Sequence, residues 1–230
     1  MSSIEDLDGW AGCPAPDPLV LDGRFVRLER WQAEAHASGL FGAICGPADD
    51  ELWRYIPAEK PQSINELTTF FDGANRRSSG QWRTLVIIDK QSDSVLGTAS
   101  YMRIREAHGS VEVGCVIYSK QLQRKPEATE AMYLMAHHVF DELGYRRYEW
   151  KCHNDNEASR HAAARLGFTF EGVFRKDLVI RGENRDTAWF SMTNDEWPGN
   201  KTGFETWLSA ENFDPSGSQI RSLAALRLAV

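Results

Sequence analysis

A long amphipathic helix, expected from about Pro126 to Leu143, constrains the fold of this chain more than any other segment. Strand-like segments lie directly before and after it, so the chain leaves a sheet, crosses over through the helix and returns as a parallel neighbour. Pro126 suits the first position of a helix, and Gly144 suits the residue after its end. The apolar residues form one stripe at helical spacing: Ala128, Ala131, Met132, Met135, Val139 and Leu143.

The other segments read as shorter helices and strands. Further helices are expected over 32–45, 63–77 and 154–166, and Ser63 and Glu66 have the spacing of a capping box. In the segment 146–152 charged residues alternate with apolar ones, which predicts a strand with one face in water. Strands are expected over 23–31, 82–89, 94–104, 109–119, 146–152, 168–180 and 186–197. This order predicts an α/β (α+β) fold, with a mixed, mostly antiparallel central sheet of about seven strands and helices on both faces.

Composition changes along the chain suggest three regions. Residues 1–18 contain three prolines at alternate positions and are expected to form an irregular arm. Residues 19–198 carry the regular pattern and are expected to form one domain. After the sequence Trp197-Pro198-Gly199 the pattern weakens, so residues 199–230 are expected to form an appendage with short helices. Whether this appendage packs on the domain or joins two copies in a dimer stays open, and the chain is expected to be a monomer or a homodimer.

Several classes of protein are disfavoured by the composition. The formal net charge of -7 argues against nucleic acid as a partner. The chain has no apolar run of about 18 residues, which argues against a membrane span. The first ten residues are acidic and lack an apolar centre, so no secretory signal is expected and the cytoplasm is the predicted location. The four cysteines are isolated in sequence, and the strand-borne Cys115 and Cys152 are expected to be buried thiols.

Three polar residues, Gln123, Arg124 and Lys125, stand directly before the long helix. The first N–H groups of a helix lack partners within the helix, and the helix dipole adds partial positive charge at the same end. Such an end binds phosphate, and the basic side chains would add donors and charge. A solvated basic loop is the plain alternative, and Glu127 in the first helical turn would compete with a bound phosphate.

A second group of motifs lies in the C-terminal half. The runs "GYRRYEWKC", "NEASRHAAARLGF" with "FEGVFR" after it, and "GENRDTAWFSM" resemble the GNAT acetyltransferase superfamily. The resemblance is greatest to the branch that contains the ribosomal-protein N-terminal alanine acetyltransferases. It covers roughly residues 20–198, with its specific motifs in the second half. It implies a GNAT fold and an enzyme that moves an acetyl group from acetyl-CoA to a primary amine by direct attack.

The resemblance also implies where the coenzyme lies. Asn156 and Ser159 correspond to positions near the pantetheine arm and the thioester sulfur. The strand residues expected to pair with the pantetheine amides are Val116, Ile117 and Tyr118. The residues expected to hold the pyrophosphate are Gln123, Arg124, Lys125, Glu127, Ala128 and Thr129, with Pro126 in the place of a family glycine. Proline removes one N–H donor, for which Arg124 and Lys125 are expected to compensate.

The catalytic residues follow less directly. Many relatives carry a tyrosine proton donor at the position of Ala163, so Ser159 is the remaining candidate to protonate the leaving thiolate. The alternative for Ser159 is a hydroxyl on the helix surface. Glu112 is the candidate general base, with a structural strand carboxylate as the alternative and Asp177 as another nearby acid. Backbone N–H groups near Cys115–Ile117, on an irregular strand, are expected to stabilise the oxyanion.

The acceptor side is read from three residues. Trp53 and Tyr55 lie in a segment that walls the acceptor in this fold, although core aromatics are the alternative. Asp186 is a candidate for binding the acceptor ammonium, with a backbone- or Arg185-bound aspartate as the alternative. No metal is expected, because the adjacent His137 and His138 point apart on a helix. The open alternatives for function are an aminoglycoside or polyamine acetyltransferase and a non-catalytic acyl-CoA-binding module.

Overall fold

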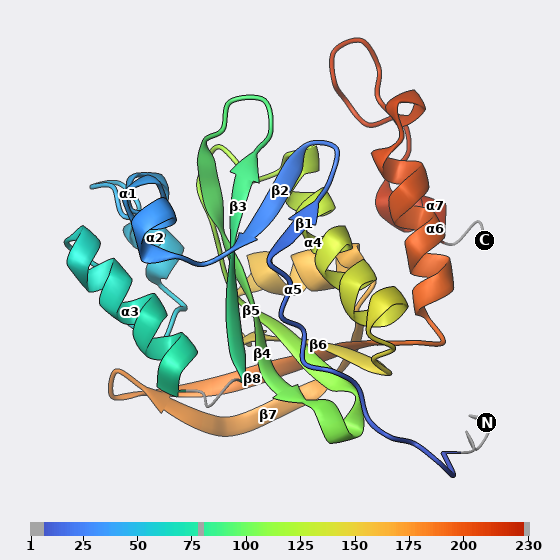
Figure 1. Cartoon of the computed structure of the whole chain (residues 1–230), viewed down its shortest axis with the longest axis horizontal. Helices are drawn as coiled ribbons and strands as arrows, with labels where there is room; N and C mark the ends of the chain where they lie inside the picture. Colours follow the sequence, from blue (N-terminus) through green and yellow to red (C-terminus); the bar gives the residue numbers. More distant parts are fainter. Residues whose placement is uncertain (1–6, 78–80, 228–230) are drawn as a thin grey trace.

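The computed structural model describes residues 7–77 and 81–227, and its centre is one sheet of eight strands (Figure 1). The strand order is β1-β2-β3-β4-β5-β6-β8-β7, and every neighbouring pair is antiparallel except β5 and β6. The predicted crossover through the long helix is therefore confirmed. The strands are β1 (Val20–Asp22), β2 (Val26–Arg30), β3 (Trp82–Asp89), β4 (Val95–Arg105), β5 (Ser110–Tyr118), β6 (Arg147–His153), β7 (Thr169–Ile180) and β8 (Glu183–Thr193). The short strand β1 was not expected.

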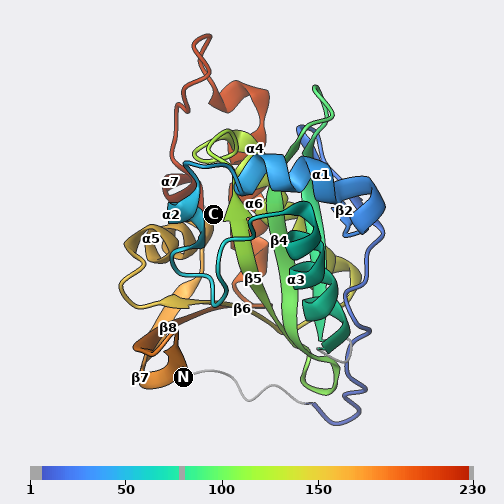
Figure 2. The ribbon, with the colours of Figure 1, turned by 90° about the vertical axis from the view of Figure 1, so that its left-hand side faces the viewer.

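Helices cover both faces of this sheet, as Figures 1 and 2 show. On one face lie α1 (Ala33–Ile44), α2 (Asp50–Trp53) and α3 (Ile64–Arg77). On the other lie α4 (Pro126–His137), α5 (Glu157–Leu166), α6 (Trp197–Leu208) and α7 (Leu223–Arg227). Helix α4 continues into a π turn over His138–Glu142, and single 3-10 turns cover Glu106–His108 and Ala210–Asn212. The expected helices are confirmed, and only the short α2 has no counterpart in the sequence prediction.

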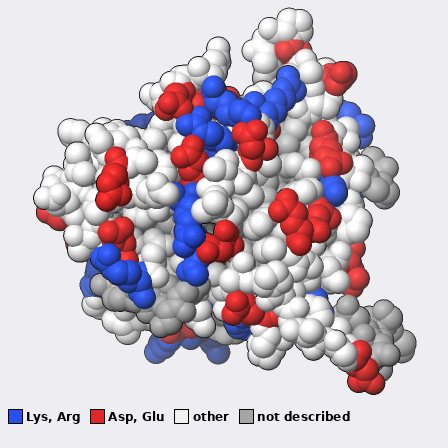
Figure 3. All heavy atoms as spheres, viewed as in Figure 1, with Lys and Arg blue, Asp and Glu red and all other residues white. Residues whose placement is uncertain are grey.

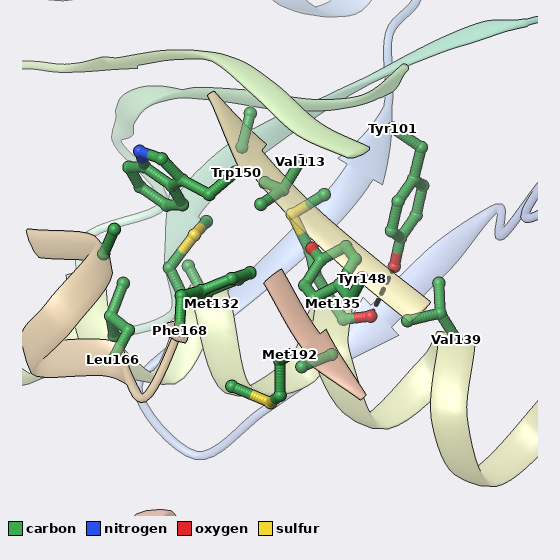
Figure 4. Packing of buried hydrophobic residues seen from close by; sticks show 14 of the residues in the cluster. Tyr101, Val113, Met132, Met135, Val139, Tyr148, Trp150, Leu166, Phe168 and Met192 are labelled. Atoms are coloured by element: carbon green, nitrogen blue, oxygen red, sulfur yellow. Dashed lines mark hydrogen bonds between the residues drawn. The ribbon is translucent and has the colours of Figure 1, made fainter. Parts of the chain in front are cut away.

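The core has two layers because β3 is apolar on both sides. Leu85 and Ile87 pack toward the α4 face, while Val86 and Ile88 pack toward α1 and α3. A strand that is covered on both faces needs a continuous apolar run rather than alternation. In Figure 4 the α4 layer brings Met132 and Met135 against the aromatic side chains of β6. The hydroxyl of Tyr101 donates to the carbonyl of Met135 at 2.8 Å, so this buried tyrosine has a partner.

Glu130 on α4 is the polar exception within this layer. Its carboxylate is buried and accepts the backbone N–H groups of Arg24, Phe25 and Val26 at 2.7, 2.6 and 2.8 Å. A side chain on Gly23 would lie 2.6 Å from the Glu130 carboxyl carbon. The helix thereby holds the turn between β1 and β2 against the sheet, since three charge-assisted hydrogen bonds replace the lost hydration.

The C-terminal helices are part of the same core. Helix α6 starts at Trp197, two residues before the expected appendage, and lies against α4, while α7 packs on α5 and α6. Tyr133 on α4 donates to the carboxylate of Glu205 on α6 at 3.0 Å. The buried residues that these helices add are Trp197, Phe204, Trp207, Leu223 and Leu226. The described part of the segment 199–230 therefore contains short helices, as predicted, joined by the loop 213–222, and these helices pack on the domain.

The prediction that one face of β6 contacts water was wrong. Glu149 is 1% exposed, and the side chain of Lys151 is 7% exposed. Their charged groups pair at 2.8 Å, and the Lys151 ammonium lies 3.8 Å from the centre of the Trp189 ring on β8. Pairing of opposite charges offsets the desolvation cost of burying these two side chains. The alternation of charged and apolar residues alone cannot distinguish buried ion pairs from residues exposed to solvent.

Charges on the outer surface are intermixed. In Figure 3, Lys and Arg side chains lie next to Asp and Glu side chains across the face that Figure 1 presents. Ion pairs bring opposite charges together, as where Arg83 meets Asp17 at 3.1 Å and Lys90 meets Asp22 at 2.8 Å.

Candidate active site

The two parallel strands β5 and β6 separate in the middle of the sheet. Their pairing runs from Ser110 with Arg147 to Val113 with Trp150 and ends there. On the other side, β5 contains a bulge in which Cys115 and Val116 stand opposite one residue of β4. Cys115 has φ of +47°, which turns the strand away from β6. Beyond Val113, the backbone of β5 therefore has an edge toward β6 with no strand partner. The irregularity expected near Cys115–Ile117 is present.

A cavity of about 520 Å³ opens where the strands separate, and we call it the central cavity. Glu112 to Val116 form one wall, and the end of β6 with Asn156 and Ser159 of α5 forms another. An adjoining hollow of about 430 Å³, the outer hollow, lies nearer the tip of the β7–β8 hairpin. The residues that line both are Tyr55, His153, Ile180 and Arg185.

Helix α5 presents Asn156 and Ser159 to the central cavity. Asn156 is the N-cap, and its Oδ1 accepts the Ser159 N–H at 3.0 Å, so its amide NH₂ stays available for other partners. The indole N–H of Trp150 donates to Ser159 Oγ at 2.9 Å. Because this bond uses a lone pair of the oxygen, the hydroxyl hydrogen is left to be donated elsewhere. Both predicted residues thus lie where a ligand in the cavity would meet them.

Glu112 is 3% exposed and lines the same cavity. Arg103 Nη1 lies 2.7 Å from each of its carboxylate oxygens, and Lys151 Nζ lies 2.9 Å from Oε2. The sequence analysis did not identify these two cations. Arg103 belongs to an irregular part of β4 with φ of +45°, and no sequence pattern indicates that it reaches across to β5.

The ion network continues from Lys151 to Glu149. Burial alone would raise the pKa of Glu149, but hydrogen bonds from Lys151 and Arg147 outweigh it, and the net pKa lies below the ordinary value. The thiol of Cys115 behaves differently, since burial raises its pKa to about 12. Cys115 is therefore a neutral thiol at physiological pH and is unsuited as a nucleophile. Burial also raises the pKa of Cys152, which is buried as expected, whereas Cys115 is only partly buried and lines the central cavity.

The basic doublet lies at the start of α4, as expected. Arg124 has φ of +62°, and Lys125 is the residue before the first helical position, which Pro126 occupies. Both side chains are exposed, and neither makes an ion pair within the described part of the chain. The amide of Gln123 donates to the carbonyl of Tyr118 at 3.1 Å, which ties this loop to the end of β5.

The other predicted coenzyme residues are divided between ligand-facing and buried positions. Val116 lines the central cavity, whereas the side chain of Ile117 is buried against α1 and α3. The hydroxyl of Thr129 accepts from Arg165 Nη1 at 3.0 Å, and this second arginine near the α4 terminus was missed. Three other predicted residues lie nearby: Tyr118 with an enclosed hydroxyl, Glu127 with an enclosed Oε2, and Ala128.

Of the two aromatic residues predicted to contact the acceptor, Tyr55 lines the central cavity and Trp53 does not. Tyr55 lines both hollows, and its hydroxyl donates to the carbonyl of Asp155 at 3.2 Å. Trp53 does not line the central cavity: it is 2% exposed and donates to the Ile44 carbonyl at 2.8 Å. Trp53 thus occupies the core position that the sequence analysis left as its alternative.

Asp186 also lies outside the lining of both hollows. Its carboxylate accepts the Lys176 N–H at 2.8 Å and the Asn184 amide at 2.7 Å, and these two bonds, in that order, lower its pKa. The Asp186 carboxylate therefore stabilises the β7–β8 hairpin. The predicted contact between Asp186 and the acceptor ammonium has no geometric support. His153 and Arg185 line the cavity instead, and neither was identified from the sequence.

His153 offers a donor rather than a base at this wall. Its Nδ1 accepts the backbone N–H of Asp155 at 3.1 Å, which places the hydrogen of the neutral ring on Nε2. Within residues 7–77 and 81–227, no group of three or more possible metal ligands occurs, and no helix has the length and apolarity to cross a bilayer.

Comparisons with known proteins agree with this geometry. Residues 26–169 match the model of the acetyltransferase (GNAT) domain. A GCN5-related N-acetyltransferase from Brucella melitensis is 41% identical, with a TM-score of 0.91 over 96% of this chain and 99% of that one. A probable acetyltransferase from Chromobacterium violaceum is 35% identical, with a TM-score of 0.79 over 86% and 98%. YdaF of Bacillus subtilis, assigned by name to the ribosomal N-acetyltransferases, is 30% identical over 108 residues, which are 47% of this chain and 58% of YdaF.

Proposed function

This chain belongs to the GNAT acetyltransferase family, and on that basis we propose that it moves an acetyl group from acetyl-CoA to a primary amine by direct attack. The amine belongs to a peptide N-terminus or to a small molecule. One observation carries the proposal: the edge of β5 beyond Val113 is open next to Ser159 and Glu112. The name of YdaF, which places it among ribosomal N-acetyltransferases, supports an amine of a ribosomal component as one acceptor class.

The residues present fit acetyl-CoA as the donor. An open strand edge pairs with amides of an extended chain, as the pantetheine arm requires, and Val116 to Tyr118 supply that edge. The α4 terminus with Arg124 and Lys125 suits the pyrophosphate. Pro126 offers no N–H, so the two side chains replace part of what a glycine backbone would contribute. Arg165, held on Thr129, adds a further cation at this end.

Three parts of the site serve the chemistry. Backbone N–H groups at the Cys115–Ile117 bulge stabilise the carbonyl oxygen as it gains negative charge. Ser159 gives its hydroxyl hydrogen to the leaving sulfur, directly or through water, while Trp150 fixes the position of its oxygen. Glu112 accepts the proton that the acceptor ammonium loses to become a neutral amine, and Arg103 and Lys151 hold its carboxylate in place. The second proton, which the nitrogen loses after attack, returns through water to the Ser159 oxygen, so the step ends with an amide, a free thiol and a neutral serine.

The site favours an amine with a low pKa. At pH 7 deprotonation costs about 1 kcal/mol for an α-amino group and about 4.6 kcal/mol for a lysine side chain. Both oxygens of Glu112 already have cationic partners in Arg103 and Lys151, so a permanently charged ammonium would compete with them for the carboxylate. Positive charge nearby also favours the neutral form of the acceptor. An α-amino acceptor is therefore preferred to a lysine side chain.

Release of free coenzyme A thiol tests the proposal. The purified protein is mixed with acetyl-CoA and, separately, with peptides that carry a free N-terminus, with the same peptides blocked at the N-terminus, and with lysine-containing blocked peptides. Thiol release that depends on a free α-amine is expected. Release that is equal with and without every amine, or absent throughout, would refute the proposed function. Preference for the lysine peptides would overturn the choice of α-amines.

A further inference from the structure

Arg185 on β8 brings an unpaired guanidinium to the acceptor side of the site. It lines both the central cavity and the outer hollow and is half-buried. Its Nε is enclosed and has no hydrogen-bond partner among residues 7–77 and 81–227. Burial lowers its pKa, and Glu112 and Asp177 act on it only as neighbouring charges. An arginine that loses hydration without gaining an ion pair is costly, which suggests that its partner is a ligand.

The chain's own carboxylates near this arginine are engaged elsewhere or are exposed. Glu112 is held by Arg103 and Lys151, and Asp186 by the hairpin backbone. Within the described residues no carboxylate forms an ion pair with Arg185. Asp155 and Glu183 line the outer hollow from exposed positions. Pairing between Arg185 and an internal acid therefore does not account for its placement.

The charge of the surrounding wall points to the same ligand chemistry. Arg54 and Arg181 line the outer hollow together with Arg185, and Lys151 and Arg103 line the central cavity. Arg54 pairs with Glu51 and Arg181 with Glu59, while Glu112 pairs with Arg103 and Lys151, so among these cations Arg185 alone lacks a carboxylate partner within the described residues. An acceptor that carries negative charge would supply this partner, whereas a polyamine or aminoglycoside would not.

We propose that Arg185 binds a carboxylate carried by the acceptor, so that the enzyme selects amines bearing a carboxylate a few bonds from the reacting nitrogen. The guanidinium fits a carboxylate through paired N–H donors, which a lysine cannot reproduce. The amine then lies toward Glu112 and the carboxylate toward the β7–β8 hairpin. This inference rests on the proposed N-acetyltransferase function. It makes Arg185 a specificity-determining residue.

The carboxylate can belong to the side chain of the first residue of a peptide or to a free amino acid. Matched pairs of acceptors distinguish these two sources. One pair consists of C-terminally amidated peptides that begin with aspartate or with asparagine and are otherwise identical. The other pair is free alanine and alaninamide. For each pair, kcat/KM is measured with acetyl-CoA and corrected for the fraction of neutral amine. The ratio of carboxylate-bearing to neutral acceptor is the readout for the wild-type protein, Arg185→Gln, Arg185→Lys and the control Arg175→Gln on the neighbouring strand.

In the wild-type protein the ratio is expected to exceed about tenfold in at least one pair, since a charge-assisted hydrogen bond is lost with the neutral acceptor. Arg185→Gln should bring that ratio close to one, Arg185→Lys should retain part of it, and Arg175→Gln should leave it unchanged. A wild-type ratio of one or less in both pairs, or an unaltered ratio in Arg185→Gln, would overturn the inference while leaving acetyl transfer established. No acetylation of any of the four acceptors would instead count against both proposals.

Discussion

The indole N–H of Trp150 on β6 donates a hydrogen bond to the hydroxyl oxygen of Ser159 on α5 at 2.9 Å. This contact joins β6, at the point where it separates from β5, to α5 on the same wall of the central cavity. It fixes the serine oxygen beside the open edge of β5 and leaves its hydrogen for a ligand. In the proposed mechanism Ser159 protonates the leaving group and Trp150 positions the serine.

Ser159→Ala tests that assignment. Loss of the proton donor is expected to lower kcat by about 100-fold, at the lower end of the range for general acid catalysis, with little change in the KM for acetyl-CoA. Steady-state kinetics would measure both constants. Ser63→Ala, which removes a hydroxyl at the start of α3, is the control and should retain wild-type kcat. A Ser159→Ala enzyme with full turnover would return this serine to the role of a helix-surface hydroxyl.

Glu112→Gln tests the general base. We expect kcat/KM at pH 7 to fall by about tenfold or more. The deficit should shrink as the pH rises above about 8, because the α-amine is then already neutral. Asp177→Asn, which alters an acid outside the cavity lining, should show no such dependence. If the loss in Glu112→Gln were constant across this pH range in a folded protein, the carboxylate would be structural rather than a proton acceptor.

The Arg124-Lys125 doublet is expected to bind the pyrophosphate. Replacing both residues by alanine should raise the KM for acetyl-CoA by about tenfold or more, with kcat within about twofold, because charge-assisted contacts to phosphate are lost away from the reacting atoms. The matched control is the other Arg-Lys doublet, Arg175-Lys176, whose lysine also has positive φ. An unchanged KM in the first double variant would make the doublet a solvated basic loop.

The buried Glu149 links stability to pH. Its folded-state pKa lies below the ordinary value, so its contribution is present above about pH 4.5 and is lost as the pH falls through the folded value. Glu149→Gln should lower the Tm at pH 7 by about 5 °C or more, since it leaves buried cations without their partner. The difference from wild type should narrow below pH 4.5. Thermal unfolding followed by circular dichroism would measure this, with the exposed Glu205→Gln as the control.

The elements with strong periodicity were predictable from the sequence. The stripe along α4, the apolar run of β3 and the turn between β7 and β8 each report a local pattern, and the structure contains all three. The three-residue β1 and the four-residue α2 are too short to show a period. The resemblance to the acetyltransferases supplied what local patterns could not, namely which loop and which helix are expected to face the coenzyme.

The polar contacts of the site were not predictable in the same way. Arg103, Lys151 and Arg185 come together from three strands that lie far apart in the sequence, and one of them depends on a bulge. The alternation of charged and apolar residues along β6 predicted that Lys151 faces solvent. A strand with a buried charge network and a strand with a solvent-exposed face have the same alternating sequence. Trp53 was predicted to line the acceptor site because it is an aromatic residue. Its indole N–H instead donates a hydrogen bond to the Ile44 carbonyl in the core.

The most direct test of the central claim is a balance of products. Acetyl-CoA and an aspartate-initiated peptide are incubated with the enzyme, and mass spectrometry counts acetylated peptide while a thiol reagent counts free coenzyme A. Direct attack predicts one acetyl group on the α-amine for each thiol released, with both products reduced together in Ser159→Ala. Binding of acetyl-CoA without any acetylated amine, across this peptide and the neutral acceptors, would contradict the account and identify the chain as a non-catalytic acyl-CoA-binding module.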